Sequence, residues 1–336
     1  MKKYRSIAAT SKGKIISLIL AGGKGVRLWP LSTPENPKPF LRLIGGRSFL
    51  RLAYERALKI SLKEKIFIST LQHLGKKVLE ELPEFPAKNL ILEPEARNTA
   101  PAIALGAMTL QRFGKEAVMA VFPADHYIED SNKFRKAVLR AAAHAREGDF
   151  LVTFGVKPES PSTEYGYIEV ETQRNGKTAK ASRASKAFKI PEVSKGIFKV
   201  RRFTEKPGLR KAKSFLRRGN YYWNSGMFVW RSDTILKALQ KHAPDILECL
   251  SPAGETSPAR RSSASPHSRV GNKSLDTRTK QVQAAIERAF SKVRSVSIDY
   301  AIMEKADNCY MVPLETTWKD FGSWLSVYEY LKKDGQ

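Results

Sequence analysis

Apolar residues in the first half of the chain gather in short runs that alternate with longer segments of helical periodicity. The run at 15–20 is rich in β-branched residues, as expected of a parallel strand covered on both faces. Similar runs predict strands at 65–70, 89–94, 117–125 and 150–156. Helical periodicity predicts helices at 48–60, 72–82 and 132–147, and a further helix that starts at 100 and is capped by Thr99. This alternation predicts a parallel, doubly wound sheet.

The second half of the chain is more mixed. The segments 165–171 and 196–207 predict an antiparallel pair of strands around a basic insertion. Helices are predicted at 209–219, 281–293, 297–305 and 323–333, a strand at 309–315, and a strand followed by a helix within 227–242. The whole chain is therefore predicted to be an α/β protein with a Rossmann-like, doubly wound mixed sheet.

Polar segments follow three of the predicted strands of the first half. They are the glycine turn at 22–25, EPEARNT at 93–99 and PADH at 123–126. Ligands of doubly wound sheets bind outside the carboxyl ends of the strands. We therefore expect one binding crevice at this edge of the sheet.

The glycine turn in LILAGGKGVRLWPLS (18–32) has the chemistry of a phosphate site. Gly22, Gly23 and Gly25 remove side chains where the chain turns, so backbone N–H groups can approach a ligand closely. Arg27 follows with a planar fork of donors. A Walker A loop is excluded because no Ser or Thr follows the Gly-Lys pair, and the dinucleotide fingerprint lacks its third glycine. An ordinary tight turn is the alternative.

The net charge of +26 is the extreme feature of the composition. Much of the excess lies in two polar, non-periodic stretches, 172–189 and 258–280, which are typical of surface insertions. Neither carries a zinc-ligand spacing or an aromatic RNA-binding signature, so we expect no specific nucleic-acid partner. No apolar run approaches the roughly 20 residues that span a bilayer, and only Cys249 and Cys309 are present, so we expect a cytoplasmic protein without a membrane partner.

Together the motifs resemble a known family, the bacterial mannose-1-phosphate guanylyltransferases among the sugar-1-phosphate nucleotidyltransferases. The glycine turn is followed, in the family's order, by NPKPFL, EPEARNTAPAIALGA, FPADHYI, EYGYIE, FTEKP, YYWNSGMFVW, SIDYAIMEK and WKDFGSW. The segments RNTAPAIA and WNSGMF resemble the mannose enzymes more than the glucose-1-phosphate thymidylyl- or uridylyltransferases. Val26 departs from the family, which usually carries a small polar residue there.

The resemblance implies the reaction. GMP passes from GTP to α-D-mannose 1-phosphate, giving GDP-mannose and pyrophosphate by in-line displacement with Mg²⁺ or Mn²⁺. The attacking phosphate is already anionic, so no general base is needed and catalysis depends on positioning, metal and positive charge. A nucleotidyltransferase for another hexose 1-phosphate, such as glucose 1-phosphate, and a catalytically silent, nucleic-acid-associated relative are the alternatives. A homodimer is left open.

The resemblance also implies site residues. The catalytic residues are Arg27, Lys38, Asp125 and Lys206, and Asp125 and Asp320 hold the metal. The nucleotide is bound by Leu20, Ala21, Gly22, Gly23, Gly25, Arg27, Asn98, Thr99, Pro123 and Asp125. The sugar phosphate is bound by Gly166, Glu205, Lys206, Asn224 and Asp320. Outside the family pattern, each is explained equally well as a turn, cap or surface residue.

The same resemblance suggests how the chain is divided. Residues 1–14 are a basic extension and 15–336 a single nucleotidyltransferase domain. Within it, 15–156 bind the nucleotide and 157–336 the sugar phosphate, with a mobile insertion at 252–280. Only twelve residues follow Trp324, so we expect no C-terminal β-helix or cupin domain.

Overall fold

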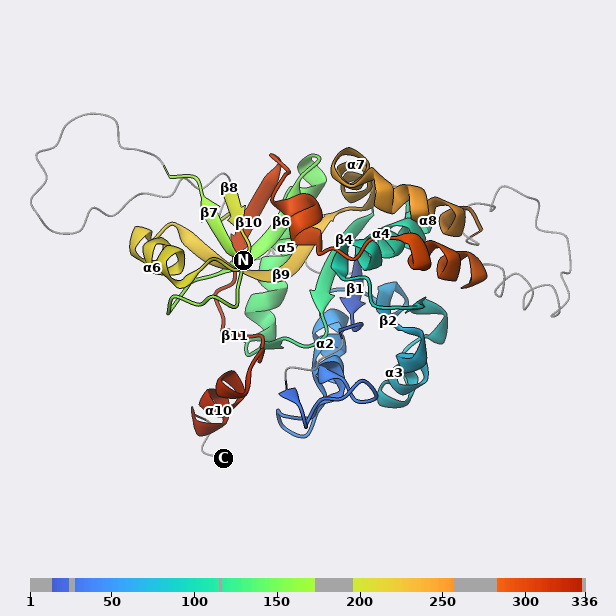
Figure 1. Cartoon of the computed structure of the whole chain (residues 1–336), viewed down its shortest axis with the longest axis horizontal. Coiled ribbons are helices and arrows are strands. Elements are labelled where there is room, and N and C mark those ends of the chain that lie inside the picture. Colours follow the sequence, from blue (N-terminus) through green and yellow to red (C-terminus); the bar gives the residue numbers. More distant parts are fainter. Residues whose placement is uncertain (1–13, 24–27, 115–116, 173–195, 257–282, 334–336) are drawn as a thin grey trace, which may run out of the picture.

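The structure, a computed structural model, describes residues 14–23, 28–114, 117–172, 196–256 and 283–333 (Figure 1). Gly25 and Arg27 of the glycine turn, the stretch 258–280 and nearly all of 172–189 lie outside these residues. The described chain forms a mixed sheet with helices on both faces, which confirms the predicted α/β class.

The main sheet has nine strands in the order β3-β2-β1-β4-β9-β6-β10-β8-β7. The strands are β1 (Ile15–Leu20), β2 (Ile66–Leu71), β3 (Leu90–Glu93), β4 (Val118–Pro123), β6 (Leu151–Val156), β7 (Tyr167–Val170), β8 (Phe198–Thr204), β9 (Tyr221–Arg231) and β10 (Cys309–Pro313). The neighbours β3, β2, β1 and β4 are parallel, as the alternating pattern predicts. The predicted pair β7 and β8 is antiparallel.

Strand β9 joins the two halves of the sheet. It lies between β4 and β6 and is antiparallel to both. It is eleven residues long and begins at Tyr221, six residues before the strand predicted from the pattern, and its first three residues also pair with β7. The strand is irregular between Asn224 and Phe228, because its pairing with β6 shifts register there and Gly226 has a positive φ of 66°.

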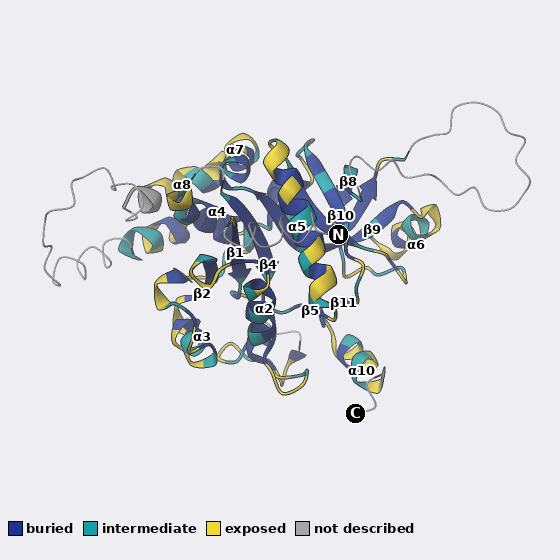
Figure 2. Cartoon of the chain, turned by 180° about the vertical axis from the view of Figure 1, so that it is seen from behind, coloured by how far each residue is buried: buried dark blue, intermediate teal, exposed yellow. Residues whose placement is uncertain are grey.

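Helices cover both faces of the sheet, and their outer sides are exposed (Figure 2). They are α2 (Phe49–Leu58), α3 (Gly75–Glu81), α4 (Thr99–Leu110), α5 (Ser131–Glu147), α6 (Leu209–Arg218), α7 (Ser232–His242), α8 (Pro244–Thr256) and a helix over 283–292. Helix α10 (Trp324–Lys333) instead stands away from the sheet (Figure 1) and packs in a separate apolar cluster with Phe49 and Phe321. Helices α4, α7 and α8 pack in one apolar core, in which Ile16 and Leu18 of β1 take part, while Ile15 packs with α5 in another. The buried β1 therefore needs apolar residues on both faces, which explains its nearly continuous apolar run.

Two details of the predicted helices are corrected. The N-cap of α4 is Asn98, whose Oδ1 accepts the Thr99 N–H at 2.8 Å, and not Thr99. Thr99 Oγ1 instead accepts the backbone N–H of Ile298 at 2.9 Å, which ties α4 to a distant segment. That segment, predicted to be helical over 297–305, forms only the five-residue π-helix η8 (Asp299–Met303).

Two further expectations concern the insertion at 252–280 and membrane-spanning segments. Helix α8 runs to Thr256, so the first five residues of the predicted insertion 252–280 are helical. Among the described residues, no helix is both long and apolar enough to cross a bilayer.

Candidate active site

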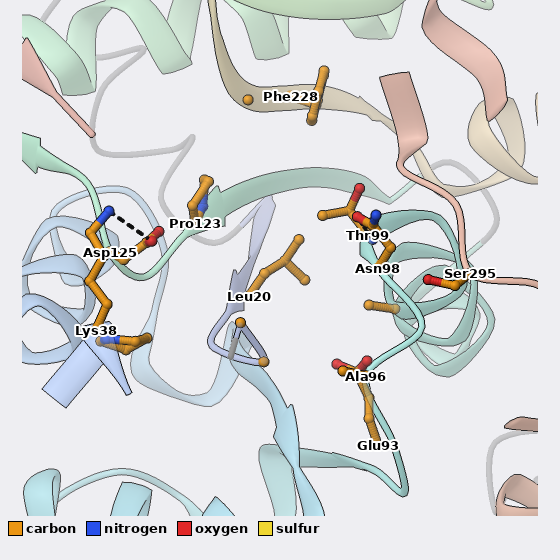
Figure 3. Close-up of a pocket in the computed structure, with 15 residues that line it drawn as sticks. Leu20, Lys38, Glu93, Ala96, Asn98, Thr99, Pro123, Asp125, Phe228 and Ser295 are labelled. Atoms are coloured by element: carbon orange, nitrogen blue, oxygen red, sulfur yellow. Dashed lines mark hydrogen bonds and ion pairs between the residues drawn. The ribbon is translucent and has the colours of Figure 1, made fainter. Parts of the chain in front are cut away.

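A cavity of about 470 Å³ opens beyond the carboxyl ends of β1, β3 and β4. It is lined by Leu20, Gly22, Gly23, Lys38, Pro39, Glu93, Ala96, Asn98, Thr99, Ala102, Pro123, Asp125, Gly226, Phe228 and Ser295. Figure 3 shows Lys38 and Asp125 at one end, Glu93, Asn98, Thr99 and Ser295 at the other, and Leu20 and Pro123 between them. The crevice expected from the three polar segments is therefore present, and all three line it.

The glycine turn forms the floor of this cavity as far as it is described. The N–H of Ala21 donates to the carbonyl of Ser69 at 2.7 Å, which anchors the chain as it leaves β1. A Cβ on Gly23 would meet no atom within 4 Å, so this glycine faces open space. Ala21 itself is buried behind the turn and does not line the cavity.

One end of the cavity holds a cation between two carboxylates. The buried Lys38 Nζ lies 3.0 Å from Asp125 Oδ2 and 2.7 Å from Asp320 Oδ1, and it also donates to the backbone carbonyl of Asp320. Burial by itself lowers the pKa of Lys38, but the two carboxylates outweigh it and raise the pKa above its ordinary value. The ammonium is therefore charged at neutral pH.

A small second sheet brings these two carboxylates together across almost two hundred residues. Strands β5 (Tyr127–Ile128) and β11 (Trp318–Lys319) pair antiparallel, with Trp318 opposite Ile128. Asp125 lies in the turn before β5, and Asp320 follows β11 directly. The proximity expected of Asp125 and Asp320 thus has a simple structural cause.

His126 completes a group of three potential metal ligands with Asp125 and Asp320, whose ligand atoms lie within 4.8 Å of one another. The indole N–H of Trp318 donates to His126 Nδ1 at 3.3 Å, so that nitrogen is an acceptor and the proton sits on Nε2. Burial lowers the pKa of His126, which favours this neutral form. Nε2 lies 3.5 Å from Asp320 Oδ1 and 3.9 Å from Asp125 Oδ1, so we expect His126 to orient the carboxylates rather than to bind a metal.

The donor set of Asp125 and Asp320 fits Mg²⁺ or Mn²⁺. Both ions prefer carboxylate oxygens, and Mg²⁺ sites typically combine one or two carboxylates with substrate phosphates. The carboxylates already hold a positive charge between them, that of Lys38, beside an open cavity. Because that position is filled by the ammonium, a divalent cation can take both carboxylates only if Lys38 moves toward the cavity.

The other end of the cavity contains a carboxylate that the sequence analysis missed as a site residue. Glu93 is only 4% exposed, and the hydroxyl of Ser69 donates to its Oε1 at 2.7 Å. Burial raises its pKa to about 7, because a charged carboxylate loses its hydration there. A carboxylate at the end of an apolar strand was the available signal, since few charged residues are buried without a purpose.

Four of the five residues expected to bind the sugar phosphate, Gly166, Glu205, Lys206 and Asn224, lie together. Gly166 is needed there, because a Cβ would sit 2.4 Å from Glu205 Oε2. Glu205 is therefore packed against the bare backbone, and burial raises its pKa. Asn224 lies beside the same glycine. Lys206 Nζ is 3.6 Å from Glu205 Oε1, whereas Asp320 belongs to the charged end with Lys38.

Asp299 joins this group and was also missed. Asn224 Nδ2 donates to Asp299 Oδ1 at 2.7 Å. Burial and the carboxylate of Glu205 raise the pKa of Asp299 to about 7. Its signal was present in SIDYAIMEK, a segment whose pattern indicated only a helix.

Comparisons with known proteins agree with this geometry. The family model for nucleotidyl transferases matches residues 16–336. The chain belongs to the nucleotidyl transferase family. A structure from Thermus thermophilus, described as mannose-1-phosphate geranyltransferase, is 30% identical to this nucleotidyl transferase, with a TM-score of 0.73 over 94% of this chain and 79% of that one.

Two curated relatives are more similar in sequence. The xanthan biosynthesis protein XanB of Xanthomonas campestris is 37% identical over 96% of this chain and 60% of its own length. The mannose-1-phosphate guanylyltransferase of Escherichia coli K12 is 36% identical over 95% of this chain and 60% of its own length. This nucleotidyl transferase thus spans about 60% of the length of the curated relatives it matches.

Proposed function

We propose that this nucleotidyl transferase transfers GMP from GTP to α-D-mannose 1-phosphate, releasing pyrophosphate. The observation that carries the proposal is the two-ended cavity, with a charged centre at one end and a buried carboxylate at the other. A nucleoside triphosphate matches this layout, because its phosphates need cations and its base needs a polar contact in an otherwise apolar pocket. The names of curated relatives support mannose 1-phosphate as the acceptor.

Glu93 supports guanine as the base. The Watson–Crick edge of guanine presents two neighbouring N–H donors, N1–H and N2–H, and an ionised carboxylate accepts both. Adenine offers one donor and one acceptor there, and uracil one donor between two acceptors. A buried carboxylate leaves either of them with mismatched groups, which costs about 1–3 kcal/mol for each unsatisfied group.

Asp125 and Asp320 would hold the divalent cation, which supplies charge neutralisation for the triphosphate. With both carboxylates engaged by the cation, the ammonium of Lys38 would be available to the phosphates of the nucleotide. The salt bridges keep this side chain charged and beside the cavity until then. Arg27, which lies outside the described residues, would clamp the β- and γ-phosphates, and Lys206 would contact the phosphate of the sugar.

The reaction then needs no general base. The sugar phosphate attacks the α-phosphorus of GTP as an anion, and pyrophosphate leaves in line. The chain's own contribution is to align the two phosphates and to offset their charge in the cavity. Two free cysteines support a reducing, cytoplasmic setting for the proposed enzyme, which would form a homodimer.

Pyrophosphate release over a grid of nucleoside triphosphates and hexose 1-phosphates tests the proposal. We expect GTP with mannose 1-phosphate to give the highest kcat/KM, and full activity after EDTA treatment would contradict the metal assignment. Glu93→Gln should lower kcat/KM for GTP by about 10–100-fold and reduce the preference for GTP over UTP. Glu95→Gln, an exposed change of the same charge in the same loop, is the control and should leave that preference unchanged.

A further inference from the structure

Asp299 and Asn224 form a fixed donor–acceptor pair beside the nucleotide cavity. Asn224 lies two residues before Gly226 in β9, and Gly226 and Phe228 both line the cavity. Asp299 follows Ile298, whose N–H is held by Thr99 Oγ1 of the cavity wall. The pair therefore lies close to the cavity, beside Gly166 and the Glu205 carboxylate.

The hydrogen bonds of Asn224 determine which of its atoms can meet a ligand. Its Oδ1 accepts the N–H of Gly226 at 3.2 Å and lies 3.2 Å from the hydroxyl of Thr153. Its Nδ2 donates to Asp299 Oδ1, and among the described residues no other acceptor of Nδ2 is present. Asn224 is 8% exposed, and its Nδ2 carries two N–H groups, so the second one is available to a ligand.

This arrangement changes the role expected of Asn224. The sequence analysis treats Asn224 as a sugar contact, but its oxygen is used by the backbone at Gly226. It acts chiefly as a positioning residue, because its fixed amide holds the carboxylate of Asp299. The stronger group for a ligand is then Asp299, with the spare N–H of Asn224 beside it.

The chemistry of the pair suits a polyhydroxylated ligand. A carboxylate next to an amide N–H can accept a hydrogen from one hydroxyl and donate to its neighbour, as two adjacent hydroxyls of a sugar ring require. A metal ion is a poorer match, since the group of metal-ligating atoms found among the described residues is Asp125, His126 and Asp320. Lys206 lies close by to take the phosphate of the same ligand.

We propose that Asp299 is a specificity-determining residue that reads hexose hydroxyls, with Asn224 holding its carboxylate in place. This inference rests on the proposed function and adds a residue to its sugar-binding part. The carboxylates of Asp299 and Glu205 are then the hydrogen-bond acceptors of the sugar site. Removing the charge of Asp299 should weaken the contact to the sugar ring and leave the contacts to the phosphate and to GTP intact.

Calorimetry on the full chain tests this, with mannose 1-phosphate and inorganic phosphate as separate probes. We expect the wild type to bind mannose 1-phosphate at least tenfold more tightly than phosphate, and Asp299→Asn to lose most of that difference while binding phosphate unchanged. Asp307→Asn, an exposed change of the same charge at the end of the same segment, should behave as wild type. Circular dichroism checks that each variant is folded.

Each other outcome is decisive. If Asp299→Asn keeps the full preference for mannose 1-phosphate over phosphate, or if the wild type has no such preference, the inference is wrong. If the wild type prefers another hexose 1-phosphate and Asp299→Asn abolishes that preference, Asp299 reads a sugar and only the mannose assignment fails. If binding behaves as expected but no nucleotide supports pyrophosphate release, the proposed reaction fails and the sugar site stands.

Discussion

The proposed site has two ends, a nucleotide end around Lys38 and a sugar end around Asp299 and Glu205, and they balance their charges in different ways. At the nucleotide end, Lys38 is held by Asp125 and Asp320 at hydrogen-bond distance, so a buried cation and two carboxylates compensate one another. At the sugar end, the carboxylate of Glu205 raises the pKa of Asp299, and the Lys206 ammonium near Glu205 is largely exposed.

This difference indicates how the charges of the carboxylates at each end can be compensated when a ligand binds. The nucleotide end can replace one cation by another, because its carboxylates are already arranged around a positive charge. The sugar end lacks a comparable buried cation among the described residues. Besides the Asn224 amide and the exposed Lys206 ammonium, its carboxylates can be stabilised by partial protonation or by the hydroxyl donors of a ligand. Buried groups that lower stability in the free protein are frequently found where a ligand binds.

Breaking the charged centre should have the largest effect. Asp320→Asn should lower kcat by about 10²–10³-fold or more, the scale for one preorganised electrostatic contact. It should also lower the free energy of unfolding by about 1–3 kcal/mol, because Lys38 loses a charged hydrogen-bond partner while it stays buried.

A double variant separates the two effects of Asp320→Asn. Adding Lys38→Met removes the buried ammonium, which keeps only Asp125 as a charged partner in Asp320→Asn, and Asp125 is 31% exposed and can be solvated without it. The double variant should therefore regain part of the stability in urea unfolding, while pyrophosphate release stays lost. Recovery of activity in the double variant would contradict the role of Asp320 in the reaction.

The free energy of unfolding should depend on pH, because two carboxylates with raised pKa values are buried in the folded chain. The ordinary pKa values of Glu93 and Asp299 are 4.5 and 3.8, and both are raised to about 7 in the folded chain. Between these values the folded state binds protons that the unfolded state has released, so stability is lost as pH rises toward 7. Glu93→Gln and Asp299→Asn should each raise the free energy of unfolding by about 1–3 kcal/mol at pH 8.

The same two variants should have little effect at pH 4, where both carboxyls are already neutral in the folded chain. Urea unfolding at the two pH values measures the difference, with Glu95→Gln and Asp307→Asn as exposed controls. A gain in stability that is equal at both pH values would argue against titration of these groups as its cause.

Replacing one glycine at each end of the site by alanine should give the smallest effects. These two variants test whether the two ends bind different substrates. A Cβ at position 166 would collide with the Glu205 carboxylate, so Gly166→Ala should raise KM for the sugar phosphate about tenfold and leave KM for GTP unchanged. A Cβ on Gly23 meets nothing, so Gly23→Ala should alter stability by less than about 0.5 kcal/mol.

The two glycine variants should raise KM for different substrates. Gly23→Ala places its methyl group in the open cavity and should raise KM for GTP. Steady-state kinetics with each substrate varied in turn checks this. If both variants affect the same substrate, the division of the site into two ends is wrong.

The sequence by itself determined the fold class, the parallel half of the sheet and the polar segments that line the cavity. These follow from local information: apolar runs predict buried strands, and strand ends predict where a ligand binds. The same information could not identify the roles of Glu93 and Asp299. Their burial depends on neighbours far along the chain, such as Ser69 and Asn224.

Only the tertiary structure decided how the charges are shared. The β5–β11 pair brings Asp125 and Asp320 around Lys38, and no spacing in the chain encodes that distance. Asn98 rather than Thr99 caps α4, because Thr99 is engaged by Ile298 from the other half of the chain. Hydrogen bonds and pKa values depend on distances of a few ångströms, and packing sets these distances only once the chain has folded.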